Sequence, residues 1–138
     1  ARTLADRLAE ASAEWLHSRV RKEWGFPDED NVSLDSLFRE EYRSIRPAFG
    51  YPACPDHSEL RKVFSLLGVE KIGIGLTENC AITPAASVSG MYMAHPQSKY
   101  FSIGRVDREQ IDDYAERKGI SIKECEELLY SNLSYEPE

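Results

Sequence analysis

The chain has 138 residues, 41% of them apolar, which is enough for one globular domain or part of one but not for two. Its 24 acidic and 17 basic side chains give a net charge of -7, so the surface as a whole repels phosphate backbones and anionic lipids and argues against a nucleic-acid partner. No run reaches the roughly 20 apolar residues of a membrane span, and the three widely spaced cysteines suggest neither a disulfide framework nor a zinc ribbon, so we expect a cytoplasmic protein with no membrane partner.

The first predicted element is a helix from Leu4 to about Glu23. Its apolar residues recur at helical spacing and cover more than half of the helical wheel, which predicts a helix that packs on two sides. No stop signal separates this helix from Ala1, so we interpret the sequence as a piece of a longer polypeptide. The remaining arc of the wheel is typical of a solvated face and consists of Asp6, Glu10, Glu14, His17 and Arg21.

A proline-rich segment follows a short helix that Ser33 can cap. Three prolines and a glycine interrupt residues 47–55, so this stretch forms neither a helix nor the interior of a sheet. We expect it to hold its amide and carbonyl groups in fixed positions, because proline restricts the backbone. Arg46 at its start can grip a carboxylate through two parallel hydrogen bonds, and Gly50 allows a ligand to approach the backbone closely. On composition alone, a rigid connector with a salt-bridged arginine is the alternative.

The second half of the chain predicts helices around an antiparallel centre. Helix signals flank β-like segments, and this order of elements favours an α+β fold. The remaining predicted elements are a helix at 59–67 that Gly68 closes in the left-handed conformation, strands at 71–76 and 80–83, and a hairpin of 87–94 with 100–106. Asp107 and Gln110 predict a capping box at the start of a helix that ends at Lys118, and Ser121 starts a last helix to about Tyr130.

The segment RPAFGYPACPDH, residues 46–57, resembles the RPAPGYPxCPxH signature of the activation domain of cobalamin-dependent methionine synthases. The later segments LTENCAITPAASVSGMYMAHPQSKYFSIGRV and DYAERKGIS continue the resemblance in order, and the opening LADRLAEASAEWLH shares it. The similarity runs from about Thr3 to Tyr135. It implies a C-shaped α+β domain, built on a twisted antiparallel sheet flanked by helices, of which residues 1–138 form the carboxy-terminal part, the upstream part being absent.

The resemblance implies a site for S-adenosylmethionine. This ligand carries a sulfonium and an ammonium, so a desolvated carboxylate at Glu10 would be stabilising. Tyr100 would pack against the nucleoside and keep its hydroxyl free for the ribose. Tyr51 and His57 would face the corrin when a cobalamin domain docks. No catalytic residue and no metal ligand is implied in this chain, and the implied ligand-binding residues are Glu10, Arg46, the backbone of Ala48 and Gly50, Tyr51, Tyr100 and Phe101.

The function implied by the resemblance is reactivation. In this family cobalamin oxidises to inactive cob(II)alamin, and rescue couples one-electron reduction to methyl transfer from S-adenosylmethionine. The isolated chain would be a non-catalytic binding domain of a methyltransferase that moves a methyl group from methyltetrahydrofolate to homocysteine. Cobalamin and zinc would belong to other domains, the zinc to the homocysteine domain. The implied partners are the cobalamin-binding domain and a flavodoxin or flavodoxin-like methionine synthase reductase, contacted through Arg19, Arg21, Lys22 and Lys99.

Two departures from the family pattern stand out. Phe49 replaces the second proline of the signature, and its partner does not follow from the sequence. An acidic residue that the family supplies from upstream is absent, so we expect binding weaker by about 1–3 kcal/mol if a charged hydrogen bond is lost.

Three other functions remain open. The chain could be a separately encoded reactivation or regulatory subunit. Residues 114–128 have the spacing of a helix-turn-helix, although the second helix is acidic and would be repelled by DNA. Cys54 and His57 have a C-x-x-H spacing that fits a thiol or metal enzyme, but two ligands are too few for zinc.

Overall fold

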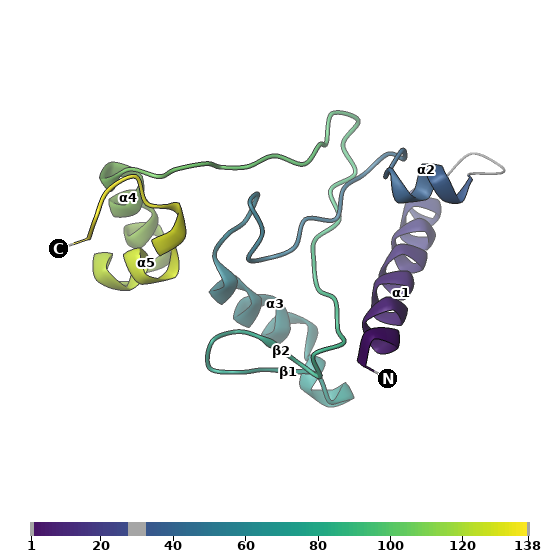
Figure 1. Ribbon diagram of the computed structural model, residues 1–138, viewed down its shortest axis with the longest axis horizontal. Coiled ribbons are helices and arrows are strands. Elements are labelled where there is room, and N and C mark those ends of the chain that lie inside the picture. The colour runs from purple at the N-terminus through teal and green to yellow at the C-terminus, as the bar shows by residue number, and fades with distance from the viewer. Residues whose placement is uncertain (1, 28–32, 138) are drawn as a thin grey trace.

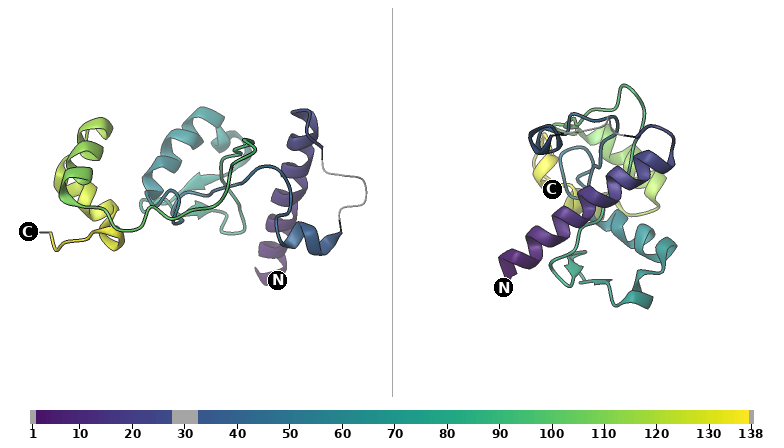
Figure 2. Two further views of the ribbon diagram at one scale, coloured as in Figure 1. Left: turned by 90° about the horizontal axis from the view of Figure 1, so that it is seen from above. Right: turned by 90° about the vertical axis from the view of Figure 1, so that its right-hand side faces the viewer.

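The computed structural model describes residues 2–27 and 33–137. The elements are helices α1 (Arg2–Glu23), α2 (Leu34–Phe38), α3 (Leu60–Leu67), α4 (Arg108–Lys118) and α5 (Ile122–Leu128), 3-10 turns η1 (His57–Glu59), η2 (Val69–Ile72) and η3 (Tyr130–Asn132), and strands β1 (Gly75–Leu76) and β2 (Ile82–Thr83). Figure 1 and Figure 2 show three groups along the molecule, with α1 and α2 at one end, α3 and the strands in the middle, and α4 and α5 at the other end. Among the described residues, no helix is both long and apolar enough to cross a membrane.

The middle group and the C-terminal group each have their own cluster of buried side chains. In the middle, Leu60 and Phe64 of α3 pack against Phe49 of the proline-rich segment. At the other end, α4 starts with the capping box that the sequence predicts, in which Asp107 and Gln110 bond each other's backbone N–H groups. The buried cluster between α4 and α5 consists of Val106, Ile111, Ala115, Cys125, Leu129 and Leu133.

The α+β class is confirmed, but the sheet is small. Strand β1 pairs antiparallel with β2, so that Gly75 faces Thr83 and Leu76 faces Ile82. The first half of the segment predicted as a strand at 71–76 belongs to η2 and the turn that follows it. Among the described residues this two-stranded pair is the whole sheet, and other extended segments meet only through isolated bridges.

The predicted hairpin of residues 87–94 with 100–106 is wrong. Met93 instead forms an antiparallel bridge with Ile45, and Val106 bridges the C-terminal segment. The N–H and C=O groups of Met93 both bond Ile45 at 3.0 Å, so these two groups are not available to pair with residues 100–106. An alternating apolar pattern indicates an extended chain but does not identify its partner, and here the partner comes from the proline-rich region.

Helix α1 lies with its polar arc toward the rest of the chain, which is the reverse of the predicted orientation. His17 and Arg21 have no exposed surface, whereas Leu4 and Trp15 are 64% and 62% exposed. The buried groups have specific partners, since the Arg21 guanidinium lies 3.7 Å from the ring centroid of Tyr42. The predicted solvated arc is therefore wrong at these two positions, and Arg21 is not available for the predicted basic contact with a flavodoxin.

Candidate functional site

A cavity of about 550 Å³ lies where the proline-rich segment meets α1, strand β2 and the segment before Phe101. It brings together six of the seven residues that the sequence predicts as ligand-binding, from three separate parts of the chain. Gly50 is the one predicted residue outside the lining. The lining consists of Glu10, Glu40, Arg46, Pro47, Ala48, Phe49, Tyr51, Pro52, Ala53, Leu60, Ile82, Ser87, Val88, Ser89, Tyr100 and Phe101.

The guanidinium of Arg46 is fixed to α1 at the wall of this cavity. Nη1 and Nη2 donate to Glu14 Oε2 at 3.3 and 3.2 Å, and Nη1 also donates to His17 Nδ1 at 3.0 Å. Burial by itself lowers the pKa of a guanidinium, but the charge and hydrogen bond of Glu14 together with the nearby Tyr42 and Tyr100 outweigh it, and the pKa of Arg46 is raised. The Arg46–Glu14 ion pair is the salt bridge that the alternative interpretation, a rigid connector, also expects. A guanidinium has five N–H donors, so Arg46 still has donors to offer a ligand carboxylate.

The backbone at the start of the proline-rich segment is held by the opposite wall. The N–H of Arg46 donates to the Tyr100 hydroxyl at 3.0 Å, so this oxygen, which the sequence suggested would be free for a ribose, already has one main-chain partner and keeps its O–H to donate. Burial raises the pKa of Tyr100, and the nearby Glu40 carboxylate adds to the shift although the Arg46 N–H opposes it. The carbonyl of Pro47 accepts from the N–H of Met91 at 3.0 Å. Arg46 and Pro47 are therefore positioned by their main chain as well as by side-chain contacts.

Gly50 is required for a reason that the sequence did not predict. It has φ +85°, and a Cβ at this position would lie 2.0 Å from Cε1 of His57. The imidazole fills the space on the Cβ side of Gly50, which by itself accounts for a glycine here, and the predicted approach of a ligand to the Gly50 backbone stays a prediction. Neither His57 nor Gly50 lines the cavity, whereas Tyr51 does and is 64% exposed at its edge.

Phe49, which stands where the family signature has proline, has a structural partner. Its side chain is buried in the cluster with Leu60 and Phe64, and part of it lines the cavity. The aromatic ring therefore ties the proline-rich segment to α3, a contact that a proline ring is too small to make in the same way.

The sequence did not single out Glu40, which also lines the cavity. Its φ of 54° places it in the left-handed region, where a non-glycine residue is uncommon. With Glu10 on α1 it gives the cavity two carboxylates in addition to the Arg46–Glu14 pair. No local pattern in the sequence signals this role, because the position of Glu40 depends on the turn that follows α2.

A second cavity of about 650 Å³ lies on the other side of residues 53–56, against α4. Its lining includes Glu109, Gln110 and Arg117 but none of the predicted ligand-binding residues. Burial raises the pKa of the Cys54 thiol there, and Asp56 and Glu59 add to the shift, which disfavours the thiolate that a thiol enzyme needs. The described residues contain no group of three or more histidine, cysteine or acidic side chains arranged to hold a metal ion.

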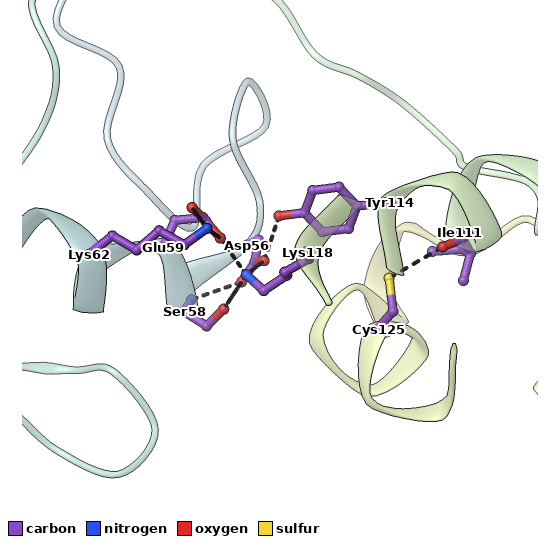
Figure 3. A network of polar contacts seen from close by, with 8 residues as sticks. All are labelled: Asp56, Ser58, Glu59, Lys62, Ile111, Tyr114, Lys118 and Cys125. Carbon is purple, nitrogen blue, oxygen red and sulfur yellow. Dashed lines mark hydrogen bonds and ion pairs between the residues drawn. The ribbon is translucent and has the colours of Figure 1, made fainter. Parts of the chain in front are cut away.

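Beyond Cys54, a buried ion-pair network joins the end of the proline-rich segment to α4 (Figure 3). Lys118 Nζ donates to Asp56 Oδ2 at 2.6 Å, to Ser58 Oγ at 2.7 Å and to Glu59. The Tyr114 hydroxyl donates to the same Asp56 oxygen at 2.7 Å. Burial by itself raises the pKa of Asp56, but the hydrogen bonds from Lys118, Ser58 and Tyr114 outweigh it and the pKa is lowered. The network fixes the segment that separates the two cavities.

The family model for the vitamin B12 dependent methionine synthase activation domain matches residues 1–119. The chain belongs to this family. A crystal structure of the MetH reactivation domain bound to AdoHcy superimposes with a TM-score of 0.93 at 53% sequence identity. The match covers 98% of this chain and 42% of that chain.

This family membership confirms the resemblance carried by the proline-rich signature. It also favours the activation-domain interpretation of α4 over a helix-turn-helix, since the family match extends through that helix. The activation-domain fold reaches the last helical turns as well, because the structural match covers nearly the whole chain.

Proposed function

We propose that this activation-domain chain binds S-adenosylmethionine in the 550 Å³ cavity and positions its methyl group for the reductive methylation of cob(II)alamin in methionine synthase. The observation that carries the proposal is the convergence of six predicted ligand-binding residues on one cavity, which has the size typical of small-molecule sites. The AdoHcy in the related MetH reactivation domain supports a sulfur-linked nucleoside as the ligand.

The charges around the cavity suit S-adenosylmethionine. Glu10 and Glu40 contribute two carboxylates to the lining, and the charge of Arg46 is balanced by its ion pair with Glu14, so the lining favours a ligand with net positive charge. A sulfonium and an ammonium supply two positive charges, and Arg46 can donate hydrogen bonds to the single carboxylate of the ligand. Both carboxylates are exposed in the ligand-free chain, and a ligand that covered them would place its cations against them, so that ligand and lining would stabilise each other.

The chain contributes placement rather than acid or base chemistry. Cobalamin, held by another domain of the synthase, supplies the cobalt that accepts the methyl group. Tyr51 and Phe101 line the cavity and are 64% and 55% exposed, so they form an aromatic rim on which a corrin ring can lie. Holding the methyl donor at this rim reduces the entropy that the transfer would otherwise lose. His57 packs beside Gly50 and is exposed, so we keep it, with Tyr51, as a residue that would face the corrin when the cobalamin domain docks.

We infer that residues 1–138 form the C-terminal part of a single activation domain. The apolar stripe of α1, including Leu4, Leu8 and Trp15, is exposed, which is unusual for a helix with so many apolar residues. The solved reactivation-domain chain is more than twice as long as the part matched here. We propose that the upstream part of the domain packs against this stripe. The proposed partners are the cobalamin-binding domain at the rim and a flavodoxin-like donor at the exposed Arg19, Lys22 and Lys99, in the cytosol.

Calorimetric titration with S-adenosylmethionine tests the proposed function. Glu10→Gln removes one cavity carboxylate with little change of shape, and we expect affinity to fall about tenfold or more, as for loss of a charge-assisted hydrogen bond. Asp6→Asn is the matched control, because Asp6 lies one turn away on the same helix, is exposed and does not line the cavity. Equal affinities for both variants would reject the cavity as the site, and no saturable binding by the wild-type chain at millimolar ligand would reject the function.

A further inference from the structure

The buried imidazole of His17 is unexplained by ligand binding, because His17 does not line the cavity. Its ring stacks on Tyr92 with centroids 4.4 Å apart and meets the edge of Tyr42 at 5.4 Å. A polar ring this deeply buried requires hydrogen-bond partners for its nitrogens. Both nitrogens have one, and one of the two partners is Arg46 at the cavity wall.

The partners determine which nitrogen carries the proton. Arg46 Nη1 lies 3.0 Å from His17 Nδ1, and a guanidinium can only donate, so Nδ1 must be the unprotonated acceptor. Nε2 lies 2.8 Å from Ser44 Oγ and therefore carries the hydrogen and donates it. The imidazole in this arrangement is neutral, with its basic nitrogen aimed at Arg46.

We propose that His17 is a positioning residue for Arg46, and that protonation of His17 releases Arg46 and weakens binding of the ligand carboxylate. The inference rests on the proposed function and concerns the regulation of the same site. A proton on Nδ1 would set an N–H donor against the Nη1 donor of Arg46 at hydrogen-bond distance. The two groups would then both be cationic and would repel each other.

The charged and titratable groups around His17 favour the same outcome. On α1, Glu14 and Arg21 lie on the same arc as His17, with Glu14 bonded to Arg46 and Arg21 stacked on Tyr42. From the segment after α2 come Tyr42, whose hydroxyl donates to Glu14 Oε2 at 3.1 Å, and Arg46 itself. Tyr92 covers the other face of the ring. Among the residues that the structure describes here, Glu14 is the carboxylate for which a protonated His17 would compete with Arg46.

Titrations with S-adenosylmethionine from about pH 7.5 to about pH 5.5, where histidines ordinarily titrate, test the inference. For the wild-type chain we expect the dissociation constant to rise on acidification, by at most about tenfold per pH unit, because one proton is linked to binding. His95→Asn should follow the wild-type profile, since His95 is exposed in a turn and bonds only its own neighbourhood. Titration of the ligand itself is common to all variants and cancels in the comparison.

Two variants of His17 separate positioning from mere burial. His17→Asn keeps an acceptor oxygen in the place of Nδ1, so we expect affinity near that of the wild type at about pH 7.5 and a flat pH profile. His17→Leu removes the acceptor, and affinity should be about tenfold weaker at every pH. A nitrogen NMR spectrum of His17 in the ligand-free chain should show Nε2 protonated and Nδ1 unprotonated near neutral pH.

The outcomes distinguish this inference from the proposed function. If the wild-type chain binds S-adenosylmethionine and the pH profile of His17→Asn still follows that of the wild type, the role of His17 is overturned. The proposed function is unaffected by that result. The opposite tautomer in the NMR spectrum overturns the role of His17 as well. Absence of wild-type binding at every pH rejects the proposed function and, with it, any pH control of that binding.

Discussion

Replacing Lys118 by methionine should destabilise the chain far more than the same change at Lys62. Methionine keeps most of the aliphatic length of lysine and deletes only the ammonium. The three N–H donors of Lys118 match three acceptors, on Asp56, Ser58 and Glu59, and the Lys118 and Asp56 side chains are only 10% and 4% exposed. Removing one partner of a buried ion pair costs about 3–5 kcal/mol. Lys62 also bonds Glu59 but is 69% exposed, so Lys62→Met should cost about 0.2–1 kcal/mol.

Urea unfolding followed by circular dichroism at several pH values measures both the size of this effect and its cause. The pKa values of Asp56 and Glu59 are lowered in the folded chain by hydrogen bonds that outweigh their burial. Their stabilisation is therefore present above the ordinary carboxyl pKa of about 4 and is lost as the pH falls through the lower folded values. The pKa of Lys118 is raised, so its contribution is lost as the pH rises through a value above about 10.4. The free energy of unfolding of the wild type should exceed that of Lys118→Met by the largest amount between about pH 5 and pH 10. The reasoning would be refuted if this difference stayed constant below about pH 4, or if it never exceeded the difference between the wild type and Lys62→Met.

Three further predictions concern the packing of the proline-rich region and are measured by the same unfolding assay. Gly50→Ala should cost more than Gly119→Ala, because the new Cβ would lie 2.0 Å from the His57 ring and the ring would have to move, whereas Gly119, with a similar positive φ, has nothing within 4 Å and its substitution should cost only about 1–2 kcal/mol; equal costs would count against the His57 contact. Ser44→Ala should be less stable than Ser44→Gly by about 1 kcal/mol, because both lose the Oγ but only alanine keeps a side chain at φ 111°, and the reverse order would contradict the strain. Phe49→Ala should cost about 3–5 kcal/mol through the cavity that it leaves beside α3, and a change below 1 kcal/mol would mean that the ring is not a core residue.

The helices and their ends could be predicted from the sequence because their signals are local. Asp107 and Gln110 form the predicted capping box, and Ser121 caps α5 through the N–H of Glu124. Gly68 ends α3 in the left-handed conformation that its position suggested. Each of these signals lies within four residues of the feature that it determines, so a single sequence contains enough information to place it.

The features that could not be predicted all depend on partners far away in the sequence. The bridge between Ile45 and Met93 replaced the predicted hairpin, and the contact of Lys118 with Asp56 spans 62 residues. The inward orientation of α1 also has this cause, because the buried polar groups of His17 and Arg21 are balanced by tyrosines that the helical pattern cannot reveal. Periodicity reports where apolar side chains fall on a helix, but a polar arc with suitable partners can be the buried one.

The predicted cavity residues had a different origin from the predicted helices. Composition alone favoured a rigid connector with a salt-bridged Arg46, and the family resemblance supplied the ligand-binding roles of Arg46, Glu10 and Tyr100. Glu40 was missed because nothing local marks it, and Gly50 was assigned a ligand contact because a glycine in a sequence does not say what fills the space beside it.

The most direct test of the account is a titration of the isotope-labelled chain with S-adenosylmethionine, followed through the amide NMR signals. We predict saturable shifts at Ala48, Ser89 and Phe101, which line the cavity, and none in α5. Saturable shifts confined to the cavity between residues 53–56 and α4 would contradict the assignment of the site, and the absence of saturable shifts anywhere would contradict the account as a whole.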